Sequence, residues 1–185
     1  DQFDSKIFTN IINFNITPGT FFSRSNIETA KKSIEFILGE KGHAFPSVLS
    51  NVALRDNSDF VDITFRVDPK KKSFVRRINI KGNTKTNDEV YRRELRQFES
   101  TTYSENKIER SKVRLQRLKF VNKVDVKKII IDEENGYMDI DFLLDETQSG
   151  EFKVGAGYSD SSGAIFNVKI QQDNFLGKGN NVAIE

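Results

Sequence analysis

Histidine and cysteine, which often act in catalysis and metal binding, are scarce in this sequence. His43 is its only histidine, cysteine is absent, and no motif in the sequence pairs His43 with a nucleophile or with further metal ligands. A catalytic triad needs a histidine paired with a nucleophile, and zinc sites usually need several His or Cys side chains. His43 follows a glycine that is typical of a helix end, so we expect it in a loop or on the surface.

The acidic and glycine-rich motifs offer no better site. DEEN at 132–135 lacks the spacing of a calcium loop and is typical of a hairpin turn. GAG and GKGNN lack the lysine spacing and the following helix of a phosphate-binding loop. The sequence therefore predicts no enzyme activity, no metal and no cofactor.

An arginine cluster is the strongest candidate for recognition. Arg92, Arg96 and Glu99 are spaced at i, i+4 and i+7, so on a helix they would share one face. Such a face is commonly a solvated surface, but arginine also pairs with carboxylates in a bidentate manner and is enriched at protein interfaces. The net charge of +2 and the lack of aromatic residues among these arginines disfavour nucleic acid.

The elements that would position this cluster occur twice. DFVDITFRVD and GYMDIDFLLD both alternate apolar and polar residues, as half-buried strands do. Two helical patterns and an extended segment, 45–54 or 121–131, precede each of them, and strand 74–81 opens the second copy. The repeat predicts a duplicated module of strand, helix, helix, strand and strand, whose first copy lacks its opening strand.

Two capping boxes predict where helices of these modules begin. Ser25 with Glu28 marks a helix in the first copy, and Thr86 with Glu89 marks a helix over 89–98 in the second.

The C-terminal residues alternate in a different composition. Apolar side chains recur at every second position on two successive segments: Phe152, Val154, Ala156 and Tyr158, then Phe166, Val168 and Ile170. The positions between them are small or polar, as in the strands of a transmembrane barrel. A water-soluble hairpin with one buried face fits the pattern equally well. No run of 18 apolar residues indicates a transmembrane helix.

Several motifs resemble the BamA family, the outer-membrane protein assembly factors of Gram-negative bacteria. FVRRINIKGNTKTNDEVYRRELRQFE and IERSKVRLQRLKFVNKVDV resemble the last periplasmic POTRA domain of that family. ETQSGEFKVGAGYSDSSG and QQDNFLGKGNNV resemble the junction and the first strands of its barrel.

This resemblance implies an α+β fold with three parts. Residues 1–70 would be the penultimate POTRA (βααββ) module, truncated at its N-terminus, and residues 71–147 the last one. Residues 148–185 would be β-hairpin strands from the start of a transmembrane β-barrel. The POTRA modules would lie in the periplasm and the barrel in the outer membrane.

The resemblance also implies partners. POTRA modules of this family dock accessory lipoproteins, BamD in particular, and pass unfolded outer-membrane proteins to the barrel. RRELRQFE matches the BamD contact motif of the family, which implies a docking site at Arg92, Arg93, Arg96 and Glu99. Phe98 stands where methionine is common in relatives, and Ser100 where glycine is common.

A second site follows from the expected sheet. The strand after the second helix of a βααββ module lies at the sheet edge, where an extended client could add through main-chain hydrogen bonds. The candidate residues on these edge strands are Val48, Leu49, Val52, Val124, Val126 and Lys128. The lysines of 121–131 equally fit an edge that is protected against aggregation.

Two other functions fit this architecture. The chain could belong to a two-partner secretion or protein-translocation pore of the same superfamily. It could also be a soluble βααββ adaptor or a nucleic-acid binder. The RRELRQFE and QQDNFLGKG motifs favour outer-membrane protein assembly.

Overall fold

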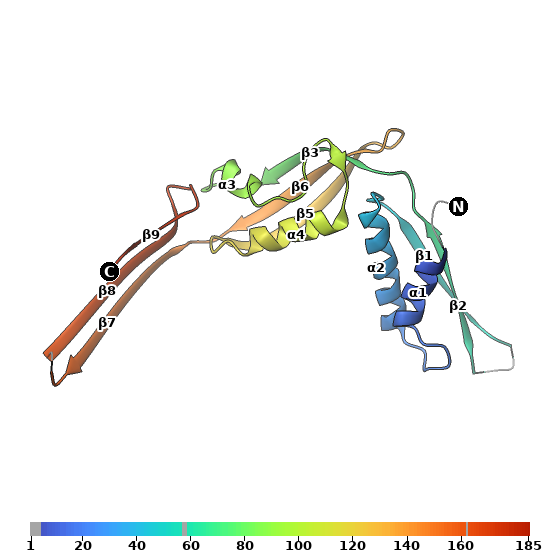
Figure 1. The fold of residues 1–185 in the computed structure, drawn as a ribbon, viewed down its shortest axis with the longest axis horizontal. Coiled ribbons are helices and arrows are strands. Elements are labelled where there is room, and N and C mark those ends of the chain that lie inside the picture. Colours follow the sequence, from blue (N-terminus) through green and yellow to red (C-terminus); the bar gives the residue numbers. More distant parts are fainter. Residues whose placement is uncertain (1–4, 57–58, 162) are drawn as a thin grey trace. The chain divides into compact units, whose positions relative to one another are not determined.

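The computed structural model describes residues 5–56, 59–161 and 163–185, and Figure 1 shows its helices and strands along the chain. The elements are α1 (Ser5–Asn15), α2 (Arg24–Glu40), β1 (Ser47–Leu54), β2 (Val61–Asp68), β3 (Phe74–Lys81), α3 (Asp88–Arg92), β4 (Thr101–Thr102), α4 (Glu105–Gln116), β5 (Val121–Asp132), β6 (Tyr137–Glu146), β7 (Gly150–Ser159), β8 (Gly163–Phe175) and β9 (Asn180–Ile184). Over the described ranges the strands form sheets in the orders β1-β2, β4-β3-β6-β5 and β7-β8-β9. The predicted α+β class is confirmed.

The chain forms two compact units. The first contains the residues up to Arg76 together with 100–106 and 130–138. The second contains 77–99, 107–129 and 139–185, so the C-terminal ribbon belongs to the same unit as much of the second repeat. The boundaries predicted after residues 70 and 147 stay predictions. No helix in the described part of the chain is long and apolar enough to cross a membrane.

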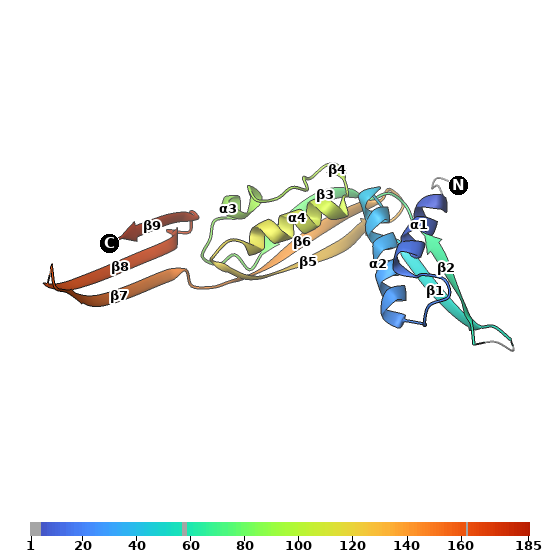
Figure 2. The same ribbon diagram turned by 60° about the horizontal axis from the view of Figure 1, so that its bottom comes forward.

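Two helices cover the first sheet. In both views α1 and α2 lie side by side next to β1 and β2 (Figures 1 and 2). Ile34 and Leu38 of α2 pack with Val48 of β1, and α1 adds partly buried apolar side chains. The buried residues of α2, which include Ile27, Ala30, Ile34 and Leu38, recur at helical spacing and so form one apolar stripe. Burial of this stripe against the sheet stabilises the helix.

The start of α2 corrects one sequence prediction. Ser23 is the N-cap, and its hydroxyl accepts a hydrogen bond from the Asn26 amide at 3.4 Å. The predicted capping box at Ser25 and Glu28 is wrong, because the helix already begins at Arg24.

The second repeat buries α4 and the centre of its sheet. Ile108 and Leu115 of α4 are buried, as are Ile78 of β3 and Phe142 of β6. The edge strand β5 lies next to β6, as the βααββ pattern predicts. The predicted helix over 89–98 is wrong in its length, because α3 ends at Arg92.

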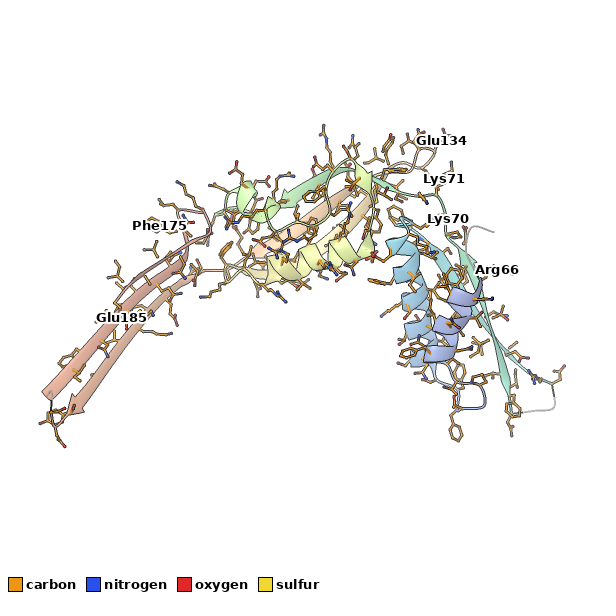
Figure 3. The ribbon with its side chains drawn as sticks, viewed as in Figure 1. Arg66, Lys70, Lys71, Glu134, Phe175 and Glu185 are labelled. Atoms are coloured by element: carbon orange, nitrogen blue, oxygen red, sulfur yellow. The ribbon has the colours of Figure 1, made fainter. Side chains whose placement is uncertain are left out.

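The C-terminal ribbon is an antiparallel sheet with aligned apolar side chains. Phe152 pairs with Ile170 and Val154 with Val168, so the apolar positions of β7 and β8 share a face. The pairing of β8 with β9 is irregular between Gln172 and Phe175. Figure 3 labels Phe175 at the end of β8. The apolar side chains of this face are exposed, so the ribbon has no core of its own among the described residues.

Candidate partner-binding sites

His43 is buried and contacts the backbone of another segment. It lies in the loop that follows α2, as expected, but it is buried rather than on the surface. Its Nδ1 atom lies 3.0 Å from the Lys70 carbonyl oxygen, within hydrogen-bond distance. Within residues 5–56, 59–161 and 163–185, no group of three or more His, Cys, Asp or Glu side chains could hold a metal ion.

Arg92 and Glu99 meet at the backbone of β3. The Arg92 guanidinium donates to the Ile78 carbonyl at 3.0 Å, and the Glu99 carboxylate accepts from the Ile78 amide at 2.8 Å. The two charged groups lie 3.6 Å apart. Arg92 also pairs with Asp88, one turn earlier on α3. The sequence predicted both residues as one cluster, and the structure brings them together at the two backbone groups of one residue of the sheet.

The prediction that Arg92, Arg96 and Glu99 share one helical face is wrong, because Arg96 and Glu99 lie beyond the end of α3. The Arg96 amide instead donates to the Ser111 hydroxyl of α4 at 2.8 Å, which stabilises a turn in place of a further helical turn. Arg93 caps the C-terminus of α3, and its side chain is 53% exposed. The four predicted docking residues therefore lie on one short segment, at and after the end of α3, but not on a single helix.

The predicted client edges have mixed exposure. Val48 and Val124 are buried in the core, whereas Leu49 and Val52 are 58% and 41% exposed. Val126 and Lys128 are half-buried on β5. Because the side chains are divided between core and solvent, an added strand would gain mainly from main-chain hydrogen bonds. Lys123 and Asp125 form an ion pair at 2.7 Å on the same strand, which is the composition of a protected edge.

The family relationship follows from the two repeats. The POTRA family model, described as a surface antigen variable number repeat, matches residues 1–70 and again 73–147. The chain belongs to the POTRA family.

The similarity to BamA covers the POTRA repeats and the ribbon. The chain is 30% identical over 180 residues to the outer membrane protein assembly factor BamA of Buchnera aphidicola, which is 97% of this chain and 29% of that protein. The crystal structure of BamA from Haemophilus ducreyi lacking POTRA domains 1–3 matches 99% of the chain with a TM-score of 0.82 and 28% identity, over 34% of its own length. The POTRA3–5 structure of Haemophilus influenzae BamA matches 77% of the chain with a TM-score of 0.73 and 29% identity, over 56% of its length. The chain therefore spans about a third or less of the full-length relative.

Glu146 is an anchor of the second POTRA repeat that the sequence did not indicate. It is the last residue of β6, and its carboxylate accepts hydrogen bonds from the amides of Thr84, Lys85 and Thr86 at 2.8–3.1 Å. The Tyr91 hydroxyl of α3 donates to the same carboxylate at 2.6 Å. Glu146 therefore fixes the loop before α3 and the helix itself.

These contacts shift the pKa values of both partners. Burial acts to raise the pKa of Glu146, but the hydrogen bonds from Thr86, Tyr91, Lys85 and Thr84 outweigh it and lower the pKa to about 2. Burial and then the bond to Glu146 raise the pKa of Tyr91. The site is therefore built around a charged Glu146 and a neutral Tyr91 at neutral pH.

The predicted capping box at Thr86 and Glu89 is wrong. Asn87 is the N-cap of α3 and makes no side-chain cap bond. The Thr86 hydroxyl instead accepts a hydrogen bond from the Asn174 amide group of the C-terminal ribbon at 2.7 Å. A Thr-x-x-Glu spacing looks the same whether the threonine caps a helix or bonds to another segment. The sequence alone therefore did not distinguish the two roles of Thr86.

Proposed function

We propose that this chain is the periplasmic end and the first barrel strands of an outer-membrane protein assembly factor. The observation that supports this function is the similarity to BamA, which extends through both POTRA repeats and the C-terminal ribbon. A POTRA repeat alone would fit several functions, because a fold does not determine a function. The proposed protein lies in the outer membrane, with its POTRA domains in the periplasm, and has no enzymatic role.

One part of this function is the docking of accessory lipoproteins, BamD in particular. Arg92, Arg93, Arg96 and Glu99 supply charges of both signs on one exposed segment. Arginine and carboxylate groups form strong charge-assisted hydrogen bonds with a partner that carries the complementary charges. Preformed contacts to β3 and α4 hold the segment in place, which lowers the entropic cost of binding.

The other part is the guidance of unfolded β-barrel proteins. β1 and β5 offer strand edges within their sheets, to which an extended client could add. Main-chain recognition has little sequence demand, and this suits a protein that handles many clients.

The test uses the full-length protein in lipid vesicles with its accessory lipoproteins. The measurement is the rate at which a urea-unfolded outer-membrane protein becomes resistant to protease and runs as a folded barrel on a gel. We expect faster insertion than in vesicles without the protein. Unchanged insertion would contradict the proposal, and release of the client into the vesicle interior as a soluble protein would indicate a secretion pore instead.

A further inference from the structure

The turn between β8 and β9 has an unusual backbone. Leu176, Gly177 and Gly179 have φ values of 54°, 69° and 69°, in the left-handed region. A branched side chain such as that of Leu176 is strained there, and such strain persists only where the surroundings enforce it. The Asn174 side chain closes the turn, because its Oδ1 atom accepts from the Gly179 amide at 2.8 Å.

This turn is seated on the loop before α3. The Asn174 Nδ2 atom donates to the Thr86 hydroxyl at 2.7 Å, and the Asn87 amide donates to the Gly177 carbonyl at 2.9 Å. Thr86 is only 4% exposed, so the contact is an interior one. Asn174 thus bonds both to its own turn and to the POTRA repeat.

The glycines of the turn permit an unusually close approach. A Cβ atom added to Gly177 would lie 2.3 Å from the Lys85 carbonyl oxygen. One added to Gly179 would lie 2.7 Å from Val90 Cγ1 and 2.8 Å from Arg93 Nη2. At Gly177 the close atom belongs to the backbone, so a side chain there would force the turn away from the loop. At Gly179 the close atoms belong to side chains, so Val90 and Arg93 would have to move, and the φ of 69° at both positions also favours glycine.

The seated turn lies against a helix that needs support. α3 has five residues, whereas isolated helices in water are marginal below about 12 residues. Its N-cap side chain makes no capping bond, and the Asn87 amide is bonded to the turn. The turn and Glu146 together therefore fix the start of α3, and the end of α3 carries Arg92 and Arg93.

We propose that the Asp173–Gly179 turn holds α3 in the conformation that binds the accessory lipoprotein, so that lipoprotein binding and seating of the first barrel turn are coupled. This inference rests on the proposed docking function. Coupling between two sites is reciprocal: if seating strengthens lipoprotein binding, a bound lipoprotein stabilises the seated turn by the same factor. The docking partner would then act on the ends of β8 and β9 without touching them.

The experiment compares Asn174→Ala and Gly179→Ala with the wild type in the full-length protein. Asn174→Ala removes the bond to Thr86, and Gly179→Ala places a methyl group against Val90. Asn167→Ala is the matched control, because Asn167 lies opposite Gly155 in the middle of the β7–β8 pairing, outside the Asp173–Gly179 turn. The measurements are lipoprotein affinity and hydrogen exchange of residues 85–93.

We expect both variants, but not the control, to bind the lipoprotein at least fivefold more weakly and to exchange faster at 85–93. Unchanged affinity, or faster exchange confined to the turn itself, would overturn the inference. If the wild type does not bind the lipoprotein, the docking function fails and the coupling with it. The exchange of residues 85–93 then reports separately whether the turn supports α3.

Discussion

Arg92 and Glu99 bond to the two backbone groups of one residue, Ile78, from the same side of β3. β4 pairs with β3 only at Phe74 and Val75, so these two side chains occupy the position of a neighbouring strand further along β3. Each therefore has a structural role in addition to its proposed docking role. Substitutions that change the charge alone are needed to separate the two.

Glu99→Gln makes this separation. The glutamine oxygen can still accept from the Ile78 amide, so only the charge is lost. Hydrogen bonds to charged groups contribute about 1.5–3 kcal/mol, so we expect lipoprotein affinity to fall at least tenfold. Protection of the Ile78 amide from exchange should stay as in the wild type. Glu99→Ala should lose both, and Glu28→Gln on α2 is the matched control. Wild-type affinity in Glu99→Gln would remove this carboxylate from the docking site.

Glu146 predicts a pH dependence of the loop before α3. Its pKa is lowered to about 2 in the folded protein, so its contribution is complete above the ordinary value of 4.5 and is lost as the pH falls toward 2. The contribution is on the order of 3 kcal/mol. We expect protection of the Thr84–Thr86 amides, corrected for intrinsic exchange, to decrease over this range.

In Glu146→Gln this decrease should be absent, and protection at neutral pH should already be lower. Glu151→Gln on β7 is the control and should follow the wild type. An equal acid dependence in wild type and Glu146→Gln would show that another group titrates.

Strand addition predicts where clients cross-link. With a photoreactive phenylalanine analogue in place of Leu49 or Val126 of the full-length protein, we expect cross-links to an unfolded outer-membrane protein. The same analogue in place of Phe36, an exposed apolar residue of α2, is the control. Mass spectrometry of the adducts would identify the contacts. Equal cross-linking at Phe36 would indicate non-specific apolar contact instead.

The ribbon predicts a difference between its two faces. The sequence has no cysteine, so single cysteines can be introduced cleanly. In the full-length protein in membranes, we expect Val154→Cys to react with an aqueous maleimide at least tenfold more slowly than Lys153→Cys. The reactive form of cysteine is the thiolate, which forms on a face in contact with water and not on a face in contact with lipid. Equally rapid labelling at both positions would argue for a water-soluble hairpin.

Period-two patterns predicted the strands well, since burial of alternate side chains determines both the pattern and the structure. GYMDIDFLLD became β6 with Met138, Ile140 and Phe142 buried. Asp139 and Asp141 are buried as well, which alternation did not predict. The buried carboxylate of Asp141 is stabilised because Asn79 and Lys81 donate hydrogen bonds to it. Such pairing depends on neighbouring strands, which a local pattern does not reveal.

The segment after Arg92 shows more clearly why local sequence patterns did not predict the whole structure. Tyr91 and Leu95 have helical spacing and both are buried, yet the chain leaves the helix between them. Long-range bonds to Ile78 and Ser111 compete successfully with further helical bonds. The seat of the β8–β9 turn was missed for the same reason. Two glycines flanking Lys178 after Asn174 were the available signal, since paired glycines often mark a close backbone approach.

The exposed apolar face of β7 and β8 has a consequence for biogenesis. Each POTRA repeat has a buried apolar core, but the ribbon gains such stabilisation only from surroundings outside the described residues. We therefore expect a newly synthesised protein to fold its POTRA repeats first and its ribbon last. Until then it needs the same protection from aggregation as the proteins it is proposed to assemble.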